Sequence, residues 1–259
     1  MIHHSKSFLT LKEEVQGLFD FAIVVNYAVP ALKHALKNVK DDEPIPFKPE
    51  HFDSRPIATE KVKANTKSYK PTLSRHIFLS TFSYFEAYFH DLLKEVIEFH
   101  GAQSLKDTLS ITHNQKLNDT ESIKEKKKLQ KYPISRDKDR YISYGKKLQK
   151  KGFRFPSSLL SSFGMNKLLE LVDGTYIPAA NIPELTESVL QLQLDEVSEI
   201  ETFQNYREIR NRIAHGRAGA SDLHLKKAIE ANNFLRNLAL KIDKHTVQNF
   251  FIVESFGDA

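Results

Sequence analysis

Apolar residues recur at intervals of three and four along most of this chain of 259 residues. That spacing places them on one side of an α-helix, whereas the alternation that marks a β-strand is hard to find. Glycine, which weakens helices, occurs only nine times. The pattern predicts an all-α protein, a helical bundle with an N-terminal helical extension and a basic helical or loop insertion.

The clearest helix is expected between Leu73 and Gly101. Ser74 is its candidate N-cap, and Gly101 is its candidate C-terminal stop. One broad apolar stripe lies between them: Ile77, Phe78, Phe82, Phe85, Phe89, Leu92, Leu93 and Val96. The segment is therefore predicted to be a core helix.

The N-terminal part of the chain is expected to differ from the rest. Residues 6–39 predict one or two helices, because Pro30 either kinks the first or opens a second. Residues 40–71 hold five of the ten prolines and predict an extended, mostly non-helical connection. We therefore divide the chain into residues 1–72, a helix with a proline-rich connection, and residues 73–259, a helical domain with a basic insertion at about 107–155.

Three further helices are expected toward the C-terminus. The first covers residues 156–174 and is weakened by Gly164. The second begins at Pro183 and Glu184 and continues as a long helix or a helix pair, with its buried side marked by Val197, Ile200, Phe203, Ile209 and Ile213. The third is capped by Ser221 and runs to about Phe250, with an apolar set of Leu225, Ile229, Phe234, Leu238 and Ile242.

Composition narrows the class of protein. The chain has no cysteine, which excludes disulfides, a thiolate nucleophile and Cys-based zinc sites. Its first residues lack the apolar core of a signal peptide. The longest apolar stretch is about a dozen residues, short of the roughly 20 that a membrane-spanning helix needs. We expect a cytoplasmic protein with no membrane partner, no metal and no cofactor, and we expect His3 and His4 in a disordered N-terminus.

Positive charge is concentrated in one segment. Residues 124–154 hold thirteen lysines and arginines against three acids, a net charge of +10 in a chain whose total is +5. Four aromatic residues lie among them, so the segment is suited to an RNA strand, with cations on phosphates and rings on bases. The alternative is a solvated helical face or a partly disordered loop. The candidate RNA-binding residues are Lys126, Lys127, Lys128, Lys131, Arg136, Lys146, Lys147, Lys150 and Lys151.

The segment REIRNRIAHGRAG, residues 207–219, holds the candidate catalytic chemistry. RNA carries its own nucleophile, the 2′-hydroxyl, so an enzyme needs a proton acceptor, a proton donor and a cation for the phosphate. Histidine performs either proton transfer near neutral pH, and arginine matches phosphate oxygens. Arg210, Asn211 and His215 are therefore the candidate catalytic residues, and no metal is required.

The spacing of these residues predicts half a site per chain. Asn211 and His215 are four residues apart and share a helix face, while Arg210 lies about 140° around the helix from His215. A twofold dimer that pairs the two motifs would place two histidines and two arginines in one cleft. Two structural interpretations stay open: His215 complements the helix dipole, and Arg210 forms an ion pair with Glu86 or Asp195.

The motif resembles the signature of the HEPN superfamily, in which an arginine, often followed by a polar residue, precedes a histidine by several residues. The aromatic helix FSYFEAYFHDLLKEV is similar to an early core helix of that superfamily, and the RiboL-PSP type is the most similar. The resemblance covers roughly residues 73–250 and implies that Glu86 supports Arg210. Some members carry a tyrosine, modified by a partner nucleotidyltransferase, where this chain has Arg217.

The resemblance implies a metal-independent endoribonuclease that leaves 2′,3′-cyclic phosphate and 5′-hydroxyl ends. It implies a homodimer with a composite active site, and a toxin or phage-defence role with an antitoxin or defence-system partner. Other members are catalytically silent, so the alternative is a non-catalytic HEPN module that binds RNA or a partner protein. A third interpretation is a helical scaffold in which the motif is incidental.

Overall fold

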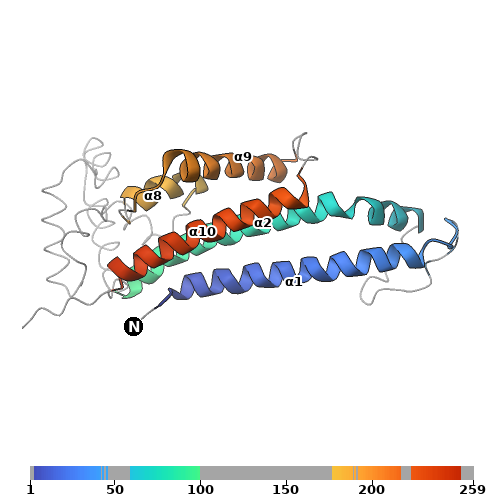
Figure 1. Cartoon of the computed structure of the whole chain (residues 1–259), viewed down its shortest axis with the longest axis horizontal. Helices are drawn as coiled ribbons and strands as arrows, with labels where there is room; N and C mark the ends of the chain where they lie inside the picture. Colours follow the sequence, from blue (N-terminus) through green and yellow to red (C-terminus); the bar gives the residue numbers. More distant parts are fainter. Residues whose placement is uncertain are drawn as a thin grey trace, which may run out of the picture. The chain divides into compact units, whose positions relative to one another are not determined.

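The structure is a computed structural model, and it describes residues 3–41, 43, 45, 59–99, 177–188, 190, 192–216 and 223–251. In these residues every regular element is a helix and none is a strand, so the all-α prediction is confirmed. The elements, labelled in Figure 1 where space allows, are α1 (Lys6–Ala35), α2 (Thr59–Phe99), η1 (Ala179–Asn181), α8 (Ile182–Ser188), η2 (Glu196–Glu201), α9 (Thr202–Ala214) and α10 (Leu225–Asn249).

The predicted core helix is present, but α2 begins earlier than the sequence indicated. All eight residues of the predicted stripe are at most 1% exposed. The expectation of an extended chain up to residue 71 is wrong from Thr59 onward, because Pro71 lies inside the helix. Ser74 is not a cap: it is buried in mid-helix, and its Oγ donates to the Lys70 carbonyl at 2.8 Å. One proline therefore does not end a helix whose other residues favour it.

The second helix predicted toward the C-terminus is a helix pair, in which α8 is followed by the continuous helix of η2 and α9. Its buried side was partly mispredicted. Six residues, Glu196–Glu201, form a π-helical turn, in which the Ile200 amide donates to the Asp195 carbonyl at 3.0 Å. A π turn contains an additional residue and shifts the later side chains around the axis. Val197, near the start of this turn, is 68% exposed, whereas Phe203, which follows the turn, is fully buried.

The final helix departs from its prediction at one position. Ile229 of α10 is exposed, although the apolar spacing placed it inside, while Leu238 and Ile242 are buried as predicted. Gly101, Ser221 and the helix predicted for 156–174 lie outside the described residues.

The contacts divide the chain into two compact units. The first unit consists of the described parts of Met1–Leu11, Phe85–Asn205 and Arg236–Ala259, and the second of those of Lys12–Tyr84 and Tyr206–Leu235. Helices α1, α2, α9 and α10 each contribute residues to both units. The predicted division at residue 72 stays a prediction.

In the first unit, two acids hold the start of α1. Asp243 of α10 is fully buried, and its carboxylate accepts from the Ser5 amide at 3.0 Å and contacts His4 Nδ1 at 2.7 Å. Glu95 of α2 accepts the next two amides, those of Lys6 and Ser7, both at 2.9 Å. The free N–H groups of a helix N-terminus are thereby satisfied. The expected disorder at His4 is therefore wrong.

The core of this unit is aromatic. Phe85 packs against Phe203 with ring centroids 5.9 Å apart, and Phe99 packs edge-on against Phe251 at 5.1 Å. Tyr88 is buried too, and its hydroxyl donates to the Ala239 carbonyl at 3.0 Å. Burial, then the nearby carboxylates of Asp243 and Glu95, raise the pKa of Tyr88 well above its ordinary value.

In the second unit, α1 and α2 run antiparallel around a smaller core. Tyr69 donates to Asn26 Oδ1 at 3.3 Å, while Lys63, earlier in α2, contacts Asp41 beyond the end of α1 at 2.7 Å. A buried cluster fills the space between the helices of this unit: Ala22, Leu73, Ile77, Phe78, Leu223, Ala228 and Ala231.

Of the described helices, α1 is long and apolar enough to cross a membrane by length and composition alone. The sequence prediction missed this because it counted only the longest apolar stretch, about a dozen residues with Asn26 and Pro30 inside it. The core helix of a soluble protein and a signal sequence meet the same two criteria, so this feature is weak evidence for a membrane protein.

The raised pKa of Tyr88 predicts a loss of stability at alkaline pH. The unfolded chain releases the hydroxyl proton of Tyr88 near pH 10, and the folded chain releases it only at higher pH. The stability that the protonated hydroxyl contributes is therefore complete below pH 10 and declines above it. Between pH 9 and pH 11, the free energy of unfolding should fall by about 1.4 kcal/mol more in the wild type than in Tyr88→Phe. Urea titrations at both pH values would measure this. Tyr27→Phe, at a side chain 78% exposed, is the matched control, and equal losses in Tyr88→Phe and wild type would contradict the assignment.

Candidate functional site

Helix α9 positions the REIRNRIAHG motif through the aromatic residues on its inner side. Tyr206 packs edge-on against Phe78 with ring centroids 6.0 Å apart, and against Phe234 of α10 at 5.6 Å. Ile209 and Ile213 pack against the core cluster of the second unit. These contacts fix the rotation of the helix, because a residue every three or four positions points inward.

Arg210 is held on the same helix by a polar neighbour and by an aromatic ring of α2. Its Nη1 donates to Asn211 Oδ1 at 3.0 Å, and its guanidinium carbon lies 5.9 Å from the centroid of the Phe82 ring. A cation over a ring face is attracted by the ring quadrupole. Arg210 is half-buried, so its charge is oriented before any anion arrives.

His215 lies where the helix ends. Its amide donates to the Asn211 carbonyl at 3.0 Å, which is the helical spacing that the sequence predicted. Gly216 follows with a φ of +62°, and its amide donates to the Ile213 carbonyl at 3.1 Å. This is a left-handed helix cap, the conformation that favours glycine after a helix C-terminus. The imidazole of His215 is consequently exposed at the end of α9.

The other predicted residues are placed as follows. Glu86 lies half-buried on α2 in the first unit, and its support of Arg210 stays a prediction. Asp195 caps η2, and the hydrogen bond from the Ser198 amide lowers the pKa of its carboxyl. All nine candidate RNA-binding residues of the basic segment, and Arg217, lie outside the described residues.

Two aromatic residues contribute to the site in ways that the sequence interpretation missed. Phe82 was predicted only as a core residue, yet its ring faces the Arg210 guanidinium. Tyr206 precedes Arg210 by one helical turn, and burial, then the charge of Glu230, raise the pKa of its hydroxyl. The available signal was spacing, because Tyr206 and Arg210 are four residues apart, as are Phe78 and Phe82.

Together these features make a cationic, histidine-bearing helix end. The guanidinium supplies a fixed positive charge with several donors, and the exposed imidazole is a group that can accept or donate a proton. This combination suits binding of a phosphodiester and transfer of a proton to or from it.

The helix cap at Gly216 gives a test of the local geometry. An added Cβ would meet no atom within 4 Å there, so Gly216→Ala costs only the left-handed backbone strain, about 1 kcal/mol of unfolding free energy. Gly17→Ala is the matched control, since Gly17 lies inside α1 with equally open space, and it should stabilise the protein by about 0.5–1 kcal/mol. Urea denaturation would measure both, and a stabilising Gly216→Ala would disprove the cap.

Comparison with known proteins gives one family. The family model described as RiboL-PSP-HEPN matches residues 54–248, which is most of the chain and includes α2, α9 and nearly all of α10. A search of curated proteins found no match, and a search of solved structures found none either. The match contains the aromatic helix and the arginine–histidine motif on which the resemblance rested. The chain belongs to the RiboL-PSP type of the HEPN family.

Proposed function

We propose that this protein is a metal-independent endoribonuclease whose active site includes Arg210, Asn211 and His215. The observation that supports it best is that α9 carries an oriented, half-buried guanidinium and that an exposed imidazole follows five residues later, where the helix ends. Membership of the HEPN family, whose modules are often ribonucleases, supports the same activity.

In the proposed reaction, a basic imidazole removes the proton of an RNA 2′-hydroxyl, and the 2′-oxygen attacks the adjacent phosphorus. The P–O2′ bond forms as the P–O5′ bond breaks, and an imidazolium protonates the departing 5′-oxygen. The products are a 2′,3′-cyclic phosphate and a 5′-hydroxyl. Arg210 holds the phosphate oxygens and stabilises the charge that develops on them.

The need for a base and an acid supports a homodimer. One motif contains one histidine, so two copies facing each other supply both proton-transfer groups from the same residue. Asn211 keeps Arg210 directed toward the phosphate through its 3.0 Å hydrogen bond. The lysines and arginines of residues 124–154 are suited to bind the flanking RNA.

The biological role that fits this activity is that of a toxin or phage-defence effector. A ribonuclease that needs no cofactor is harmful to its own cell unless it is restrained, so an antitoxin or defence-system partner belongs to the proposal. A non-catalytic module that binds RNA remains the competing function, and RNA cleavage decides between them.

The activity predicts cleavage of single-stranded or tRNA-like RNA in EDTA, with cyclic-phosphate ends. His215→Ala should lower the cleavage rate by about 10²–10⁴-fold because proton transfer is lost. Arg210→Ala should lower it by about 10²–10³-fold because charge stabilisation is lost. Gel assays with labelled RNA, and end analysis by mass spectrometry, would measure both effects.

Matched controls lie close to the motif. Arg212→Ala changes an exposed arginine of the same helix, and His224→Ala changes an exposed histidine before α10, so neither should alter cleavage by more than about twofold. Cleavage that requires added magnesium, or that persists in His215→Ala, would refute the mechanism. RNA binding by the wild type without cleavage would favour the non-catalytic module.

A further inference from the structure

The outer face of α1 is exposed and carries several large apolar side chains. Its inner face packs into the core of the second unit through Leu18, Phe19, Ala22 and Val25. On the outer face, Phe21, Ile23, Val24 and Tyr27 are between 53% and 78% exposed. Four large apolar side chains within two helical turns form a patch of the kind that marks an interaction site.

The exposed positions have the spacing of a helix that packs along a second helix. Seven exposed residues follow one another at alternating intervals of four and three: Glu13, Gly17, Asp20, Val24, Tyr27, Ala31 and His34. We call this row the α1 seam. Alternating intervals of three and four keep one row of side chains against a neighbouring helix over several turns. Val24 is its midpoint, and the small residues Gly17 and Ala31 flank it at equal distances, where another backbone can approach closely.

Within the span of the α1 seam, residues 13–34, the charges differ on the two sides of Val24. Glu13, Glu14 and Asp20 precede it, whereas Lys33 and His34 follow it; Lys12 lies just before this span. If a second copy of α1 lies antiparallel, its basic end meets the acidic end of the first, and the two helix dipoles are also opposed. A parallel arrangement would place like charges together.

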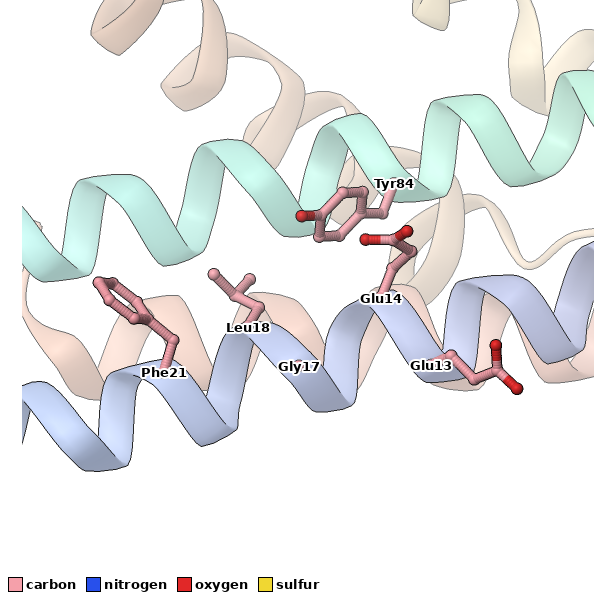
Figure 2. Close-up of a pocket in the computed structure, with 6 residues that line it drawn as sticks. All are labelled: Glu13, Glu14, Gly17, Leu18, Phe21 and Tyr84. Carbon is pink, nitrogen blue, oxygen red and sulfur yellow. The ribbon is translucent and has the colours of Figure 1, made fainter.

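The acidic end of α1 also borders a groove whose lining suits a cationic side chain. An open groove of about 410 Å³ is lined by Glu13, Glu14, Gly17, Leu18, Phe21 and Tyr84. Figure 2 shows Leu18 and Tyr84 directed into the space between α1 and α2, with the Glu14 carboxylate beside the Tyr84 ring. Carboxylates and a ring at the edge of an apolar groove favour a cationic side chain. Lys33, at the other end of α1 in a second copy, provides one.

We propose that the α1 seam binds the α1 seam of a second copy, antiparallel and with the twofold axis near Val24. The patch does not suit a lipid surface, because carboxylates lie in the same row as the apolar residues, whereas membrane-surface helices favour lysine and arginine. A single helix pair covers less than the roughly 800 Å² per partner of a standard interface, so the association should be weak and depend on concentration.

This inference does not rest on the proposed ribonuclease activity. The α1 seam lies on residues 13–34, outside the family match, which begins at residue 54. Association through it should therefore survive His215→Ala, and loss of it should leave the chemistry of the motif intact.

Oxidative cross-linking provides a direct test, because the chain contains no cysteine of its own. In Val24→Cys, the two thiols meet at the twofold axis, and copper phenanthroline should convert the full-length protein to a disulfide dimer. Lys12→Cys is the matched control. It is equally exposed on α1, but twelve residues from the axis, so its two copies are about 36 Å apart and should not cross-link. Equal cross-linking of the two variants, or none at Val24→Cys, would overturn the proposal.

A second measurement does not depend on disulfide geometry. Val24→Glu places two carboxylates at the axis and should weaken self-association in sedimentation experiments at least about tenfold, while circular dichroism stays unchanged because the side chain is exposed. His215→Ala should retain the association that Val24→Glu removes. Flotation with phosphatidylcholine–phosphatidylglycerol vesicles tests the lipid alternative. Vesicle binding that is lost in Val24→Glu, with equal self-association of Val24→Glu and the wild type, would overturn the proposal in favour of a membrane surface.

Discussion

The continuous burial of aromatic rings along α2 is the constraint on which the rest of the structure depends. Phe78, Phe82, Phe85 and Phe89 follow one another at intervals of four, three and four, and all are at most 1% exposed. Burying one such ring contributes about 1.5–3 kcal/mol. Because α2 contributes residues to both units, this single stripe supplies part of the core of each. Residues of α1, α10 and α9, the helix that bears the arginine–histidine motif, pack against it.

The same stripe links packing to the candidate chemistry. Phe82 belongs to the core by its burial, and it also presents its ring to the Arg210 guanidinium. Tyr206 belongs to the inner face of α9 and holds that face against Phe78. A charged group can be kept half-buried at low cost when its neighbours offer a ring face and an amide oxygen. The position of the arginine is thus a consequence of how the core is packed.

Sequence periodicity predicted the interior of the helices better than their boundaries. The stripe of α2 was predicted residue for residue, because three- and four-residue spacing reports directly which side of a helix is buried. The start of α2 was missed because the prolines before it suggested a break. At this start, the Thr59 hydroxyl donates a hydrogen bond to the Glu43 carbonyl, a tertiary contact that no local rule shows. Within the site, helical spacing predicted the relation of Asn211 to His215, but the ring beneath Arg210 comes from another helix and was not predicted.

Because of the π-helical turn at Glu196–Glu201, the rotation of α9 about its axis depends on the number of residues in the turn before it. An α turn would need one residue fewer, so the rotation of α9 is set by a single additional residue upstream of it. Removing that residue would leave the composition of the motif unchanged, but it would turn α9 by about 100° relative to the preceding segment. Either η2 would then lose its cap at Asp195, or Tyr206 would lose its contact with Phe78. Insertions and deletions at this turn therefore test the orientation of the motif independently of its side chains.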